Sequence, residues 1–93
     1  MAAITASGGE GGTCQVLVEQ DGREFRYTVQ VPEELTERLG AEPAAIARAT
    51  LAFLVDREPP TSIMREFECT IVRRYFPEYD QELPTYLEGP GTA

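Results

Sequence analysis

Carboxylates are the most abundant reactive side chains in this chain, which carries sixteen Asp and Glu against eight Arg in 93 residues. They come close together in the sequence at residues 66–68 and again at residues 78–82. Such pairs can serve as acid–base catalysts or as calcium ligands. A calcium loop needs several oxygen ligands around a turn that glycine permits, and residues 78–82 contain no glycine. We therefore expect solvated acidic surface there and no metal site.

Missing residue types exclude further chemistry. Without histidine the chain has no imidazole triad and no His-ligated zinc, and without lysine it has no Schiff base and no P-loop phosphate contact. Its Ser and Thr hydroxyls therefore lack a side-chain base. The glycine-rich stretch 8–12 is not expected to be a phosphate loop, because we predict neither a strand before it nor a helix after it. The sequence predicts a non-enzymatic protein without a cofactor.

The formal net charge of −8 argues against non-specific binding to nucleic acid or to anionic membranes. The most apolar stretch, residues 44–55, is too short to span a bilayer. The chain has only two cysteines, Cys14 and Cys69, and no leader that pairs a basic region with an apolar one. We expect both thiols to be reduced and buried in a cytoplasmic protein.

A β-hairpin is the clearest local prediction. Asp21-Gly22 lies between two alternating runs, and a two-residue turn there pairs Gln20 with Arg23. This register gives one apolar and one largely polar face. The apolar pairs are Val18 with Phe25, Val16 with Tyr27, and Cys14 with Val29.

Helices are expected to cover the apolar face of the hairpin. Pro32 and Gly40 delimit a short helix over residues 32–39, and prolines delimit a central apolar helix over residues 44–58. Alanines of the central helix could form a dimer seam, although packing within one chain is the simpler interpretation.

Residues 61–76 have apolar or aromatic side chains every four positions, which favours a helical segment. The segment could be one helix or two with a break at Thr70, whose hydroxyl could cap the second helix. A strand through Phe67, Cys69 and Ile71 is a third possibility.

The predicted fold class is thus α+β: an N-terminal β-hairpin packed by a short helix, a central apolar helix and a C-terminal helical segment. We expect a flexible lead over residues 1–13, a single domain over 14–82, and a flexible tail over 83–93. A core of this size stabilises a chain by only ~3–5 kcal/mol, so dimerisation or docking on another protein is expected.

Two resemblances extend this interpretation. Residues 55–59 (VDREP), 62–67 (SIMREF) and 74–79 (RYFPEY) resemble a pattern in small bacterial proteins of no assigned function, which implies a helical segment broken before Ile71. Residues 26–57 are similar to ribbon-helix-helix DNA-binding modules. That resemblance implies a dimer whose paired strands read the major groove, here through Arg26, Thr28 and Gln30, as in a repressor or antitoxin.

The segment around residues 73–79 combines arginine with aromatic side chains, as interface hot spots do. Our main hypothesis is a small acidic protein-interaction or regulatory module that binds another protein or a second copy of itself, with nucleic acid unlikely and no membrane contact. Replacing Arg73 and Arg74 with Glu should then abolish partner capture without unfolding the domain. The candidate partner-binding residues are Arg73, Arg74, Tyr75, Phe76 and Tyr79.

Overall fold

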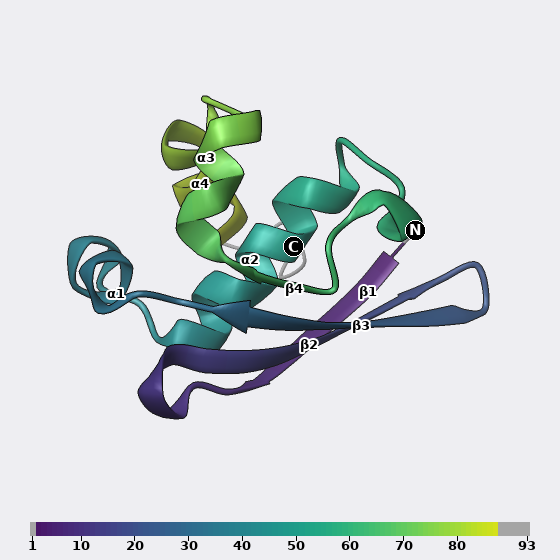
Figure 1. Cartoon of the computed structure of the whole chain (residues 1–93), viewed down its shortest axis with the longest axis horizontal. Helices are drawn as coiled ribbons and strands as arrows, with labels where there is room; N and C mark the ends of the chain where they lie inside the picture. The colour runs from purple at the N-terminus through teal and green to yellow at the C-terminus, as the bar shows by residue number, and fades with distance from the viewer. Residues whose placement is uncertain (1, 88–93) are drawn as a thin grey trace.

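A four-stranded sheet with helices on one face forms the fold, which a computed structural model describes for residues 2–87 (Figure 1). The strand order is β1-β2-β3-β4. The first three strands run antiparallel in sequence, and β4 joins β3 in parallel. The predicted α+β class is confirmed. The strands are β1 (Ala2–Gly8), β2 (Thr13–Gln20), β3 (Arg23–Gln30) and β4 (Glu66–Glu68).

The hairpin of β2 and β3 has the predicted register, with Gln20 opposite Arg23 and Cys14 opposite Val29. Asp21 and Gly22 both have positive φ, 57° and 77°, as a type I′ turn requires. The alternating side chains of both strands are buried on the face toward the helices. Turn chemistry and hydrophobic alternation thus specified the same pairing.

The N-terminal segment is not a flexible lead, because residues 2–8 form β1 along the whole outer edge of β2. A glycine-rich turn closes this second hairpin: Gly9 N–H donates to the carbonyl of Thr13 at 2.9 Å. Gly12, at φ +87°, passes so close to Val31 that an added Cβ would lie 2.5 Å from its carbonyl oxygen. The small residues of β1 have weak strand propensity, and the unpaired edge of β2 supplies the hydrogen bonds that order them.

The first two helices, α1 (Glu33–Leu39) and α2 (Pro43–Val55), follow the prediction. Pro32 precedes α1, and Gly40 ends it with φ 63°. The central helix α2 packs against β1 and β2, with Ala49 fully buried in the same chain and Ala45 exposed. Within residues 2–87, no helix has the length and apolar character needed to cross a membrane.

Residues 61–76 do not form one helix. Of the two-helix alternative, only the second helix is present, shortened to residues 72–75, and residues 62–67 form no α-helix. A turn (η2, Pro60–Ser62) leads into β4, and a second turn (η3, Cys69–Ile71) leads into the single-turn helix α3 (Val72–Tyr75). The strand alternative is right in type, but β4 covers only residues 66–68. Thr28 N–H donates to the carbonyl of Arg65 at 2.8 Å. Residues 65–68 therefore pair with the edge of β3 that β2 does not occupy. The Thr70 hydroxyl donates to the Glu68 carboxylate and caps no helix.

The C-terminal tail was predicted to begin too early, because α4 spans Tyr79–Leu87 with Pro84 inside it. We predicted no helix in this part of the chain. Burial of Tyr79 and Leu83 against α2 holds the helix in spite of the missing N–H. The rest of the predicted tail, residues 88–93, lies outside the described residues.

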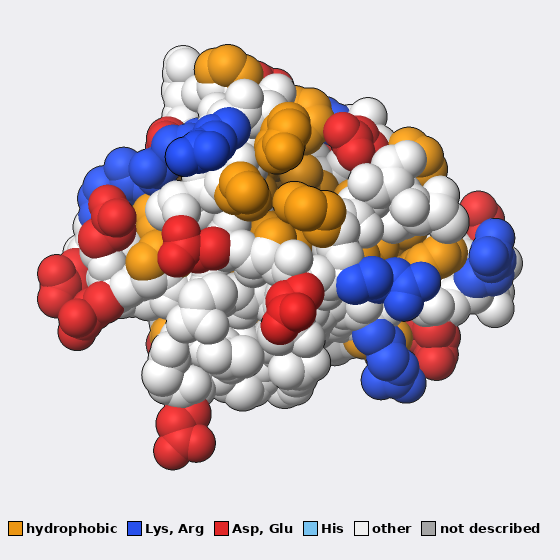
Figure 2. All heavy atoms as spheres, viewed as in Figure 1, with side chains coloured by type: hydrophobic (Ala, Val, Ile, Leu, Met, Phe, Trp, Pro, Cys, Tyr) orange, Lys and Arg blue, Asp and Glu red, His pale blue; other side chains and the backbone are white. Residues whose placement is uncertain are grey.

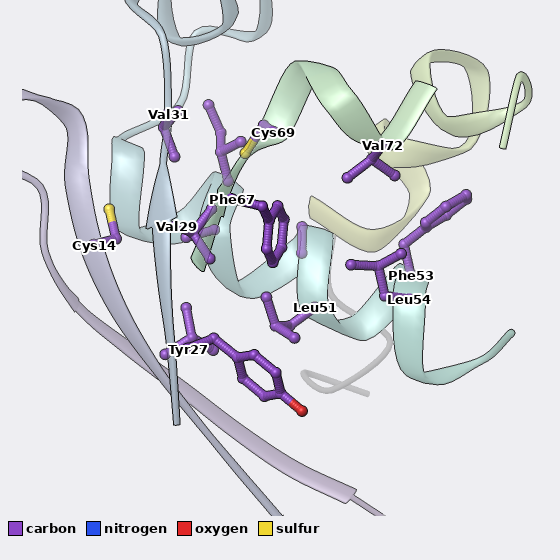
Figure 3. Close-up of a cluster of buried hydrophobic side chains, with 14 of the residues drawn as sticks. Cys14, Tyr27, Val29, Val31, Leu51, Phe53, Leu54, Phe67, Cys69 and Val72 are labelled. Atoms are coloured by element: carbon purple, nitrogen blue, oxygen red, sulfur yellow. The ribbon is translucent and has the colours of Figure 1, made fainter. Parts of the chain in front are cut away.

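The core lies between the sheet and α2, and Phe67 of β4 projects into it (Figure 3). Figure 3 places its ring among side chains of β3 and α2, including Val29 and Leu51. Tyr27 crosses the core and donates its hydroxyl to the carbonyl of Pro60 at 2.6 Å. This bond fastens the segment before β4 to the sheet, which sets one wall of the groove described next.

Candidate protein-interaction site

A groove runs between α3 and the chain segment that leads into β4, and it encloses about 270 Å³. One wall comes from η3 and α3 and the other from residues 62–67, and Figure 1 shows these segments on two sides of α2, which contributes Leu54 to the lining. The only charged side chain in its lining is Glu58. Figure 2 shows apolar side chains gathered on this face, with charged side chains around them. The lining residues are Leu54, Glu58, Ser62, Ile63, Met64, Phe67, Ile71, Val72, Tyr75 and Phe76.

Two rim residues distinguish this groove from the rest of the described surface. Met64 is 48% exposed and Tyr75 is 66% exposed, and no other large apolar or aromatic side chain among residues 3–87 is as open to solvent. They lie on opposite walls. The floor is buried, with Leu54, Ile63 and Phe67 each less than a tenth exposed. The groove is therefore a preformed apolar surface with two exposed side chains at its edges.

Three of the five predicted partner-binding residues lie at this groove. Tyr75 and Phe76 line it, and Arg74 is exposed beside Tyr75 on α3. Arg74 forms no ion pair within the described part of the chain. Its guanidinium is therefore available to a partner's carboxylate.

Arg73 and Tyr79 have structural contacts instead. Arg73 donates to Oδ1 of Asp80 at 3.0 Å, and Arg38 donates to the same oxygen at 3.0 Å. Burial opposes ionisation of Asp80, but these bonds outweigh it and hold the pKa of its carboxyl below its usual value. Tyr79 is fully buried, and its hydroxyl lies 2.8 Å from Oγ1 of Thr50. Assigning Tyr79 to the partner-binding surface was wrong.

Helix α4 is fixed by a second cluster of charged and aromatic groups. The Arg57 guanidinium lies 3.7 Å from the centroid of the Phe53 ring, and its Nε donates to Glu78 at 3.0 Å. The Tyr86 hydroxyl donates to Asp56 at 2.5 Å. Phe53 also makes an edge contact with Phe76, with ring centroids 5.8 Å apart. These contacts join α2 to α4 and position Phe76 in the groove wall.

Sequence reasoning missed Met64 and the remaining lining residues. The signal was present, because the side chains at four-residue spacing, Ile63, Phe67, Ile71 and Tyr75, all line the groove. We attributed that spacing to one face of a helix. In the structure they come from a loop, a strand, a turn and a helix that fold around the same space.

The residues predicted to read DNA lie on β3, and their side chains form hydrogen bonds within the protein. Thr28 donates to Gln15 at 3.2 Å, and Gln30 donates to the carbonyl of Gly11 at 2.9 Å. Arg26 is exposed, and its guanidinium pairs with the carboxylate of Glu24 at 3.4 Å. Over residues 28–30 both edges of β3 are paired, by β2 and by β4, so this part of the strand has no edge left for a dimer. The arrangement gives the DNA-binding alternative no support.

Both cysteines are buried free thiols, and burial raises the pKa of each. Residues 2–87 contain no group of three or more Cys, Asp or Glu that could hold a metal ion. Comparison of the chain with protein-family models, curated proteins and solved structures finds no match. Any function assigned to the groove therefore depends on its own geometry.

Proposed function

We propose that this chain is a small acidic, non-enzymatic protein-interaction or regulatory module that binds a large apolar side chain of a partner protein in the groove beside α3. One observation carries the proposal: the two most exposed large apolar or aromatic side chains, Met64 and Tyr75, lie on opposite walls of the same groove. Scattered apolar residues are normal on a surface, whereas apolar side chains gathered around a groove mark a binding site.

The size and lining of the groove favour a protein segment over a small metabolite. About 270 Å³ accommodates one or two large side chains and is below the ~300–1,000 Å³ of most small-molecule sites. Metabolite sites also carry several convergent polar groups, whereas the polar side-chain groups in this lining are those of Glu58 and Ser62 and the hydroxyl of Tyr75. A partner's Leu, Phe or Met side chain would fill the groove and bury its floor further.

The charge beside the rim indicates the chemistry of the partner. Arg74 and Tyr75 are adjacent on α3, and arginine and tyrosine are enriched among residues that dominate binding energy. We expect a partner segment with an Asp or Glu next to its apolar anchor. Residues 88–93 (EGPGTA) carry no large apolar side chain and would not fill the groove.

The proposal places this module in the cytoplasm, and the two free, buried cysteines support that location. The chain's strong negative charge supports a protein partner over nucleic acid, since phosphates would be repelled.

Selection of random peptides displayed on phage against the immobilised chain tests the proposal. We expect enriched peptides to combine one or two large apolar residues with a neighbouring Asp or Glu. Tyr75→Ser, Met64→Ser and Arg74→Glu should each weaken binding of a synthetic enriched peptide about tenfold or more. Arg74 is changed alone, because a Glu at position 73 would face Asp80 and disturb the fold.

Arg26→Glu is the matched control, since Arg26 is an exposed arginine on the open face of the sheet. It should leave peptide affinity unchanged, and urea unfolding should show that all four variants stay folded. Absence of enriched peptides, or equal binding by the groove variants and the control, would contradict the proposal.

A further inference from the structure

The outer edge of β1 is unpaired in the described structure, because β1 ends the strand order and pairs only with β2. Gly9 donates to Thr13 across this pair, and antiparallel strands alternate the direction of their backbone groups. Ala3, Thr5 and Ser7 therefore direct their N–H and C=O groups toward β2. The N–H and C=O groups of Ile4 and Ala6 point outward to the free edge.

The composition of β1 offers no protection to that edge. Proteins commonly block an exposed edge strand with a charge, a proline or a bulge. Residues 2–8 contain neither a charged residue nor a proline, and they pair with β2 without a bulge. In a chain of net charge −8, this neutral strand is a place where two copies can approach without local charge repulsion.

We propose that two copies of this chain pair antiparallel through β1 and form one continuous eight-stranded sheet. Full overlap of residues 2–8 places the two-fold axis at Thr5. Ile4 then lies opposite Ala6 of the second copy, and Ala6 lies opposite its Ile4. These are the residues whose backbone groups point outward, so both pairs can exchange two hydrogen bonds. The register that gives the longest overlap is also the one that hydrogen bonding permits.

A second copy suits this edge better than an unrelated strand. Ile4 and Ala6 are half-buried and pack against the core on the helix side of the sheet. Pairing would set the Ile4 side chain of each copy beside Ala6 of the other and extend both apolar layers. On the open face, the small side chains of Ala3, Thr5 and Ser7 leave room for a neighbouring strand.

Disulfide trapping tests the register. Thr5→Cys places two thiols opposite each other in a non-hydrogen-bonded pair, where Cα atoms lie about 4.5 Å apart, within the range that a disulfide spans. Ala3→Cys is the matched control: Ala3 is also exposed, but in this register it faces Ser7 of the second copy. We expect mild oxidation to convert most Thr5→Cys protein to a covalent dimer and to leave Ala3→Cys monomeric in denaturing gels. Cys14 and Cys69 are buried and should not interfere.

Sedimentation equilibrium tests the edge itself. Ala6→Pro removes an outward N–H but no bond to β2, whereas Ala6→Ser keeps that N–H. We expect dimers of the unaltered chain and of Ala6→Ser, and monomers of Ala6→Pro with an unchanged circular dichroism spectrum. A monomeric unaltered chain, failure of Thr5→Cys to crosslink, or a dimer that survives in folded Ala6→Pro would overturn the proposal. Neither assay involves the groove, so the two proposals fail separately.

Discussion

Thr50→Val should reveal how the buried hydroxyl pair of Thr50 and Tyr79 stabilises the fold. Both side chains are fully buried, and their oxygens lie 2.8 Å apart. The Thr50 hydroxyl also donates to the carbonyl of Ile46 at 2.8 Å. Because a hydroxyl has one hydrogen, Tyr79 must donate the bond between the two side chains.

The two single substitutions should therefore differ in cost. Thr50→Val keeps the side-chain shape but leaves the Tyr79 O–H buried without its oxygen acceptor, and the weakly accepting sulfur of Cys69 is its remaining side-chain partner. Such an unsatisfied group costs about 1–3 kcal/mol. Tyr79→Phe removes the donor, and Thr50 keeps its bond to Ile46. We expect that change to cost only about 0.5–1.5 kcal/mol, the net contribution of one hydrogen bond.

The double variant distinguishes this account from simple loss of packing. In Thr50→Val with Tyr79→Phe no buried hydroxyl is left unsatisfied, so the combined cost should be below the sum of the two single costs by about 0.5 kcal/mol or more. Urea unfolding followed by circular dichroism measures all four free energies. Additive costs, or a larger cost for Tyr79→Phe than for Thr50→Val, would refute the assignment of donor and acceptor. Peptide binding to the groove should be unchanged in Tyr79→Phe, because that hydroxyl does not reach the groove.

Two further predictions concern the turns and the response to acid. Gly22 has φ +77° and open space around an added Cβ, so Gly22→Ala should lower the free energy of unfolding in urea by about 1–2 kcal/mol through backbone strain alone. Gly12→Ala should lower it further, because its Cβ would also lie 2.5 Å from the carbonyl oxygen of Val31. A smaller cost for Gly12→Ala would contradict the close approach of the two segments. The two arginines lower the folded-state pKa of Asp80, so its stabilising effect should be present above about pH 4 and lost as pH falls through that folded-state pKa. In urea titrations, the stability difference between the unaltered chain and Asp80→Asn should therefore stay constant above about pH 5 and narrow as the pH falls below about 4. A difference that does not change below about pH 4 would show that the pairs contribute nothing.

The sequence predicted correctly the hairpin of β2 and β3 and the helix α1, because both depend on residues that are close together in the chain. Asp21-Gly22 selects a two-residue turn, and the turn sets every pair of the hairpin through the two-residue period of the strands. Pro32 and Gly40 likewise delimit α1, because each has a backbone preference that the ends of a helix use. These features needed no information from distant parts of the chain.

Two of the errors occurred where a distant strand edge decided the structure. Residues 2–8 are too small to predict a strand by themselves, and residues 66–68 follow a four-residue period typical of helix. Each segment nevertheless pairs with an edge of the β2–β3 hairpin, because an unpaired backbone edge offers hydrogen bonds to whatever segment can reach it.

At the candidate site, too, the sequence indicated residue types, whereas the tertiary structure decided which residues are exposed. The sequence alone predicted that Arg74, Tyr75 and Phe76 belong to a surface of arginine and aromatic side chains. Only the tertiary structure placed Met64 opposite Tyr75 and moved Tyr79 into the core. The type of a residue indicates what it can bind, whereas its exposure depends on which elements pack over it, and that packing joins segments far apart in the sequence.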